Sequence, residues 1–115
     1  MNMTKSNATA GDIQTLVPIC AADSLAPGQM RACDVANLPP LAIYNLDGEY
    51  LATSNICTHE VALLTDGYFE GELVECAMHG GSFNVRTGEA KSLPCKERLQ
   101  VFSVVVKDGQ VFVKI

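Results

Sequence analysis

The stretch CAMHGGSF, residues 76–83, governs the interpretation of the whole sequence, because it places a cysteine and a histidine close together beside a Gly-Gly loop. A second stretch, CTH at residues 57–59, repeats the pair. Both histidines of the chain therefore follow a cysteine by two or three residues. If they were unrelated core or surface residues, this coincidence would be unexplained. The candidate ligands are Cys57, His59, Cys76 and His79.

Two thiolates and two imidazoles together are a typical metal-binding set. Zinc accepts this set, but a zinc finger usually takes its cysteines from one element and its histidines from another. Here each segment contributes one cysteine and one histidine, and sixteen residues lie between His59 and Cys76. That order suits a two-iron cluster, in which the cysteines hold one iron and the histidines hold the other. A zinc-binding interaction module is the alternative, and colour and redox titration would distinguish it.

The length of 115 residues predicts a single domain. Residues 1–11 are polar and read as a flexible N-terminal tail, so the domain is expected over residues 12–115. No apolar run approaches the roughly 18–20 residues of a membrane helix. The net charge of −5 argues against nucleic acid as a partner.

The five cysteines, an odd number without a secretory signal, fit a reducing compartment and predict a cytoplasmic protein. Three of them have no nearby histidine and are interpreted as packed side chains: Cys20, Cys33 and Cys95.

The segments around the two motifs predict strands and turns. Residues 41–54 and 99–115 each carry an Asp-Gly pair between two β-type runs, which is typical of a tight hairpin. Shorter strands are expected within residues 15–20 and 25–35, and residues 72–85 predict a hairpin arm whose tip is the second motif. Residues 61–67 allow at most one helical turn. The prediction is an all-β sandwich or barrel with a two-tipped insertion.

The two motifs resemble the Rieske [2Fe-2S] signature, and the similarity extends over roughly residues 40–115. It points to the small Rieske ferredoxins of bacterial aromatic-ring oxygenases, such as carbazole and biphenyl dioxygenase ferredoxins. The resemblance implies a β-sandwich base with a cluster-binding subdomain of two loops at about 55–95, one [2Fe-2S] cluster on the four candidate ligands, and a proline-containing covering loop, SLPC at 92–95. Ala77 and Met78 depart from the family pattern in the second loop, not at the ligands.

The resemblance also implies a one-electron carrier between a flavin-dependent NAD(P)H ferredoxin reductase and a terminal ring-hydroxylating oxygenase, and a monomer is expected. High-potential Rieske proteins have a disulfide between the ligand loops and two hydroxyl donors to the cluster. The matching positions here hold other residues: Ala62 and Met78, and Gly81 and Phe83. Ser82 is displaced by one position. A reduction potential near the low end of the Rieske range is therefore expected.

Other functions fit less well. The catalytic subunit of such an oxygenase needs a second iron on two histidines and a carboxylate, and this chain has no further histidine. The Rieske-like small subunit of an assimilatory nitrite reductase is the second alternative, and intact ligands favour a working carrier. Five acidic residues could form a docking rim for a basic partner, although such charges more often only solvate a surface: Glu60, Asp66, Glu70, Glu72 and Glu75.

Overall fold

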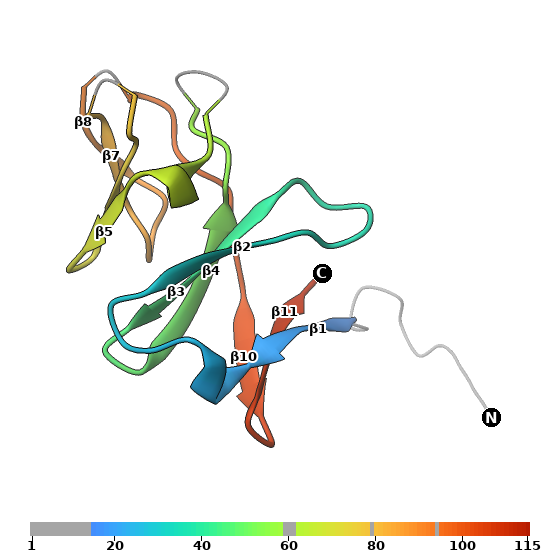
Figure 1. Cartoon of the computed structure of the whole chain (residues 1–115). Coiled ribbons are helices and arrows are strands. Elements are labelled where there is room, and N and C mark those ends of the chain that lie inside the picture. Colours follow the sequence, from blue (N-terminus) through green and yellow to red (C-terminus); the bar gives the residue numbers. More distant parts are fainter. Residues whose placement is uncertain (1–14, 59–61, 79, 94) are drawn as a thin grey trace.

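The computed structural model describes residues 15–58, 62–78, 80–93 and 95–115. The fold is all-β, as the sequence predicts, and short strands form antiparallel sheets (Figure 1). The described segments contain the strands β1 (Leu16–Ala21), β2 (Met30–Cys33), β3 (Leu41–Leu46), β4 (Glu49–Ser54), β5 (Tyr68–Glu70), β6 (Leu73–Glu75), β7 (Ser82–Asn84), β8 (Ala90–Ser92), β9 (Val101–Phe102), β10 (Val104–Lys107) and β11 (Gln110–Lys114). Two short 3-10 helices accompany them, η2 (Ala22–Ser24) and η3 (Leu64–Asp66). The expected tail, residues 1–11, lies outside the described residues.

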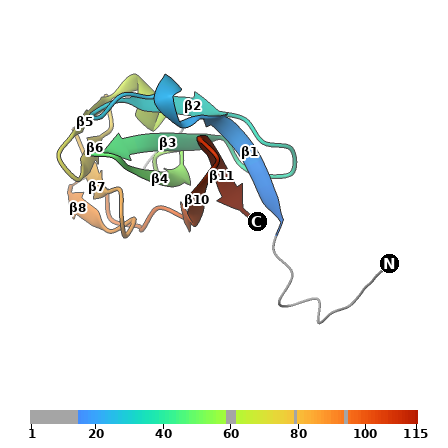
Figure 2. The same cartoon turned by 90° about the horizontal axis from the view of Figure 1, so that it is seen from below.

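The described strands form three sheets, with strand orders β1-β11-β10, β2-β3-β4-β9 and β5-β6-β7-β8. Figures 1 and 2 show the β5–β8 sheet at one end and the β1-β11-β10 sheet at the other, with β3 and β4 between them. The first two sheets form the base. The third lies in the segment between β4 and β9, which carries both cysteine-histidine motifs.

Strand β3 is buried along its whole length, because both of its faces are covered. Since side chains alternate across a strand, β3 supplies two separate cores. Leu41 and Ile43 belong to the base core, with Leu25, Ala52 and Val113. The opposite face of β3 enters a second cluster, here called the site core: Ala42, Tyr44, Leu46, Cys57, Leu64, Val74, Cys76, Phe83, Val85, Cys95 and Leu99.

The two Asp-Gly hairpins are confirmed. In the first, Asp47 and Gly48 have φ angles of 52° and 95°, and the flanking strands are β3 and β4. In the second, Asp108 and Gly109 have φ angles of 53° and 75°, between β10 and β11. Positive φ at both central residues is what the type I′ hairpin turn requires. The single turn expected within residues 61–67 is η3.

The prediction for residues 99–107 is wrong in one respect, because this run is not one arm of the terminal hairpin. Val101 and Phe102 pair with β4 as β9, whereas β10 begins at Val104 and pairs with β11. Ser103 lies at the crossing between the two sheets, where its carbonyl accepts a hydrogen bond from the Lys114 amide at 2.9 Å. Alternation along a run indicates strand conformation but not which sheet the strand joins.

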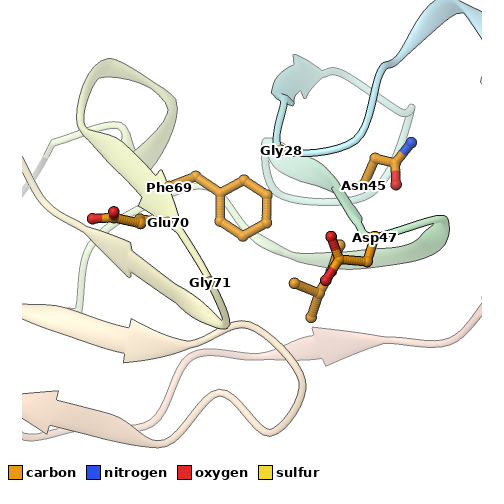
Figure 3. A pocket seen from close by; sticks show the side chains of 7 residues that line it. Gly28, Asn45, Asp47, Phe69, Glu70 and Gly71 are labelled. Atoms are coloured by element: carbon orange, nitrogen blue, oxygen red, sulfur yellow. The ribbon is translucent and has the colours of Figure 1, made fainter.

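Phe69 of β5 connects the β5–β8 sheet to the base. Its ring lies 5.1 Å from that of Tyr44 in β3, at an interplanar angle of 58°. A cavity of about 210 Å³ opens beside this contact, and Figure 3 shows Phe69 and Asp47 lining it from its two sides. Burial raises the pKa of Tyr44, and its hydroxyl forms a hydrogen bond with Thr53 Oγ1 at 2.8 Å. The ring contact between Tyr44 and Phe69 therefore joins the β5–β8 sheet to the base.

Candidate functional site

Cys57 and Cys76 each open a loop that is closed in the same way. The Cys57 amide donates to the Ala62 carbonyl at 2.9 Å, and the Cys76 amide donates to the Gly81 carbonyl at 2.8 Å. In both loops the bond runs from the cysteine to the fifth residue after it. Both cysteines are buried in the site core, with exposed fractions of 3% and 1%. The other two candidate ligands, His59 and His79, lie outside the described residues.

Asn55 anchors the first loop, and both polar atoms of its side chain are hydrogen-bonded. Its backbone amide donates to the Pro40 carbonyl at 2.8 Å, which attaches the start of the loop to the base. Its side-chain Oδ1 accepts from the Thr65 amide, and Nδ2 donates to Thr65 Oγ1, both at 2.9 Å. Asn55 is 1% exposed, and a buried amide needs such partners. Asn55 therefore joins the two ends of the loop. This role was not predicted from the sequence.

Gly67 brings the end of the first loop against the start of the second. A Cβ at this position would collide with the Glu75 carbonyl oxygen and would lie 3.0 Å from the Ala77 amide nitrogen. Only glycine leaves room for this approach. The amide of Gly67 also donates to the Leu64 carbonyl at 2.9 Å and so closes η3.

Cys95 is buried as the sequence analysis expects, but it lies beside a candidate ligand. Its sulfur is 3.7 Å from the sulfur of Cys57, and it is 4% exposed. Burial raises the pKa of the Cys95 thiol to about 12, with further contributions from the hydrogen bond to Cys57 and from the charges of Cys57 and Cys76. The sulfurs of Cys95 and Cys57 are therefore in contact within the site core, to which Cys76 also belongs.

Replacing Gly81 with alanine is expected to destabilise the protein by about 1–3 kcal/mol, the usual cost of overpacking. A Cβ at Gly81 would collide with Cys95 Sγ and lie 3.1 Å from the Cys95 amide nitrogen. Urea unfolding of the two single variants and the double variant measures the effect. In a Cys95→Ala background the same change should cost less, because the sulfur is gone. An equal cost in both backgrounds would contradict this packing.

The side chains around the second loop differ in burial and in their hydrogen-bond partners. Ser82 Oγ forms a hydrogen bond with Ser92 Oγ at 2.8 Å. Phe83 is fully buried in the site core, whereas Met78 is 49% exposed. In the covering loop expected at 92–95, Leu93 is 72% exposed, and Pro94 lies outside the described residues.

The acidic residues of the expected docking rim differ in their surroundings. Asp66, Glu70 and Glu75 are exposed. Glu72 forms an ion pair with Arg86 at 3.5 Å, so its charge is partly neutralised, and it accepts a hydrogen bond from the side-chain Nδ2 of Asn84 at 3.2 Å. Glu60 lies outside the described residues.

Two features are absent from the described residues. Without His59 and His79, they contain no group of three or more histidine, cysteine, aspartate or glutamate side chains arranged to hold a metal ion. No helix among them has the length and apolar character that crossing a membrane would need.

Comparison with known proteins identifies the type of site. The sequence model of the Rieske [2Fe-2S] domain matches residues 15–103. Ferredoxin CarAc of Metapseudomonas resinovorans is 42% identical over 100 residues, which cover 87% of this chain and 94% of the relative. The ferredoxin component of the p-cumate 2,3-dioxygenase system of Pseudomonas putida is 41% identical over 105 residues, which cover 90% of this chain and 89% of the relative.

Solved structures agree with this result. A structure described as the complex of reduced oxygenase and oxidized ferredoxin in carbazole 1,9a-dioxygenase contains a chain with a TM-score of 0.82 and 42% identity, covering 85% of this chain and 91% of that one. A nitrite reductase small subunit of Mycobacterium tuberculosis, described as putative and NADH-dependent, has a TM-score of 0.79 at 22% identity. The match covers 90% of this chain and 97% of that one. At that identity the similarity shows a shared fold and no more.

Proposed function

The chain belongs to the Rieske [2Fe-2S] domain family, and from this premise we propose that it is the ferredoxin of an aromatic-ring-hydroxylating dioxygenase system. It is an electron carrier with one Rieske-type [2Fe-2S] cluster, and not a catalyst by itself. When bound, the cluster accepts and gives up one electron at a time. The observation that carries the proposal is the pair of buried cysteines that open two loops with the same closure.

Cys57 and Cys76 are proposed to hold one iron, and His59 and His79 the other. The described residues fit this assignment, because two buried thiols in an apolar core suit a soft metal better than they suit a surface role. The matching loop closures also fit two equivalent ligand loops. We assign residues 12–115 to one Rieske domain, with residues 55–95 as the subdomain that holds the cluster and residues 1–11 as a flexible tail.

A reduction potential near the low end of the Rieske range is part of the proposal. Gly81 and Phe83 have no hydroxyl groups, and the Ser82 hydroxyl is paired with Ser92. Because hydrogen-bond donors near the ligands stabilise the more negative, reduced state, fewer donors lower the potential. Such a potential suits electron transfer from a flavin reductase to an oxygenase.

The proposed partners are a flavin-dependent NAD(P)H ferredoxin reductase and a terminal ring-hydroxylating oxygenase, and the proposed location is the cytoplasm. One relative occurs in a complex of oxygenase and ferredoxin, which supports the oxygenase partner. The acidic surface, with a net charge of −5, suits partners with a basic docking face. We propose that the carrier acts as a monomer.

Two measurements test the proposal. The purified protein is expected to be red-brown, to hold two irons and two acid-labile sulfides, and to give the low average g-value of mixed nitrogen and sulfur ligation when reduced. Replacing His59 with cysteine should move the potential down toward the roughly −400 mV of all-cysteine clusters, because thiolate replaces imidazole. The potential is measured by titration followed by electron paramagnetic resonance.

Leu63→Cys is the matched control, since it adds a thiol beside the first loop and leaves both histidines in place. Leu63 is 40% exposed, and this variant should keep the wild-type potential. A colourless protein that binds a single Zn²⁺ would overturn the proposal. A coloured protein whose His59→Cys variant keeps the wild-type potential would overturn the ligand assignment.

A further inference from the structure

Cys95 is the one cysteine of the site core that the proposed ligand set does not use. It comes from the loop after β8, 38 residues beyond Cys57 in the sequence, yet the two sulfurs lie 3.7 Å apart. This separation is within hydrogen-bonding distance for sulfur. With 4% of its surface exposed, Cys95 is shielded from water, which would otherwise compete for the same contact.

The direction of this hydrogen bond follows from the chemistry of the two sulfurs. A cysteine that holds a metal does so as a thiolate, which carries no hydrogen and can only accept. A cysteine that binds no metal is a thiol at neutral pH, with one weak S–H donor. Once Cys57 is a ligand, Cys95 is therefore the donor.

The surroundings of Cys95 hold its sulfur in this position. Its backbone amide donates to the Ser92 carbonyl at 3.2 Å. The hydroxyl of Thr58, the residue after Cys57, donates to the Glu97 carbonyl at 2.8 Å and so attaches the Cys95 loop to the first ligand loop. On another side, the space that a side chain at Gly81 would fill is occupied by the Cys95 sulfur. The contact between the two sulfurs is thus built by three separate segments.

We propose that Cys95 is a positioning residue whose thiol donates a hydrogen bond to the sulfur of Cys57 and thereby raises the reduction potential of the protein. The inference rests on the proposed function, since it requires Cys57 to be an iron ligand. A donor stabilises negative charge on the ligand sulfur, and that charge is greater after an electron is added. The reduced state therefore gains more than the oxidised state does.

The test compares the wild-type holoprotein with Cys95→Ala and Cys95→Ser by redox titration and by resonance Raman spectroscopy of the iron-thiolate stretch. Cys95→Ala removes the donor. At a fixed ambient potential the ratio of reduced to oxidised protein should fall about threefold, within the usual range of a net hydrogen bond. This corresponds to a potential lower by about 28 mV, because tenfold is 59 mV for one electron. The stretch frequency should rise, since the Cys57 sulfur then donates more strongly to iron.

Cys95→Ser restores a donor, so its potential should equal or exceed that of the wild type. Cys33→Ala is the matched control: this cysteine lies in β2 of the base, and removing its thiol should leave potential and stretch unchanged. A Cys95→Ala protein with full iron content and an unchanged or higher potential overturns the inference. Loss of iron from both Cys95 variants makes Cys95 a ligand and overturns it too. If only Cys95→Ala loses its iron, the inference is tested with Cys95→Ser alone. A Cys95→Ser potential below that of the wild type then overturns the inference.

These outcomes leave the proposed function separately testable. A wild-type protein with no iron-sulfur cluster would refute the function itself. A normal Rieske signal in the wild type, combined with a Cys95→Ala potential that does not move, would refute only the role of Cys95.

Discussion

Replacing Gly67 with alanine is expected to destabilise the holoprotein by about 3 kcal/mol or more, at or above the upper end of the range for overpacking. The added Cβ would collide with the carbonyl oxygen of Glu75 and crowd the amide of Ala77. Both are backbone atoms, so no side chain can rotate away to relieve the contact. The loop that begins at Cys76 would have to shift as a whole. Urea unfolding and iron content per chain measure the loss of stability and of cluster binding.

Gly71→Ala is the matched control for this variant. Gly71 lies in the next turn, with a φ of 59° and no atom within 4 Å of an added Cβ. The free energy of unfolding of that variant should fall by only roughly 1–2 kcal/mol, the cost of placing a residue with a Cβ in the left-handed conformation, and the variant should keep its iron. If Gly67→Ala costs no more than Gly71→Ala, the close approach of the two loops is not essential.

Replacing Phe83 with alanine is expected to cost about 3–5 kcal/mol in the free energy of unfolding. Phe83 is fully buried and lies opposite Val74 in the sheet of β6 and β7, within the site core that also contains Cys57 and Cys76. Since a domain of this kind has a total stability of about 5–15 kcal/mol, the loss is a large share. Urea unfolding followed by far-ultraviolet circular dichroism measures it, and the cluster absorbance reports the site.

Leu73→Ala controls for the loss of an apolar side chain from the same sheet. Leu73 is 40% exposed in β6. Its replacement should lower the free energy of unfolding much less than the replacement of Phe83 does, because water already reaches the Leu73 side chain. Equal effects of the two changes would show that the β5–β8 sheet is not held by its buried face.

The local features of the fold were predictable because short-range chemistry determines them. Asp-Gly pairs at 47–48 and 108–109 select one turn type, and both hairpins form there. The break at Ser103 was not predictable in the same way. Val101 and Val104 look alike in sequence but pair with Thr53 and Val113 in different sheets. The choice depends on strands that are distant along the chain, which a local pattern does not encode.

The candidate site was predictable to a similar extent. The spacing of the motifs indicated Cys57 and Cys76, and both cysteines are buried at the starts of matching loops. The contact of Cys95 with Cys57 joins residues 38 positions apart, and nothing near Cys95 in the sequence signals it. The role of Asn55 was also missed, although a polar residue two positions before a candidate ligand is a signal that could have identified it.

Strand β3 sends side chains into both cores, and this restricts where the protein can be redesigned. A change at Tyr44 affects the packing of the site core, and a change at Ile43 affects the packing of the base core. Neither face of the strand is free to vary. Attempts to alter partner choice are better directed at outward positions such as Tyr68, which is 68% exposed and belongs to neither core, because substitutions there leave the scaffold intact.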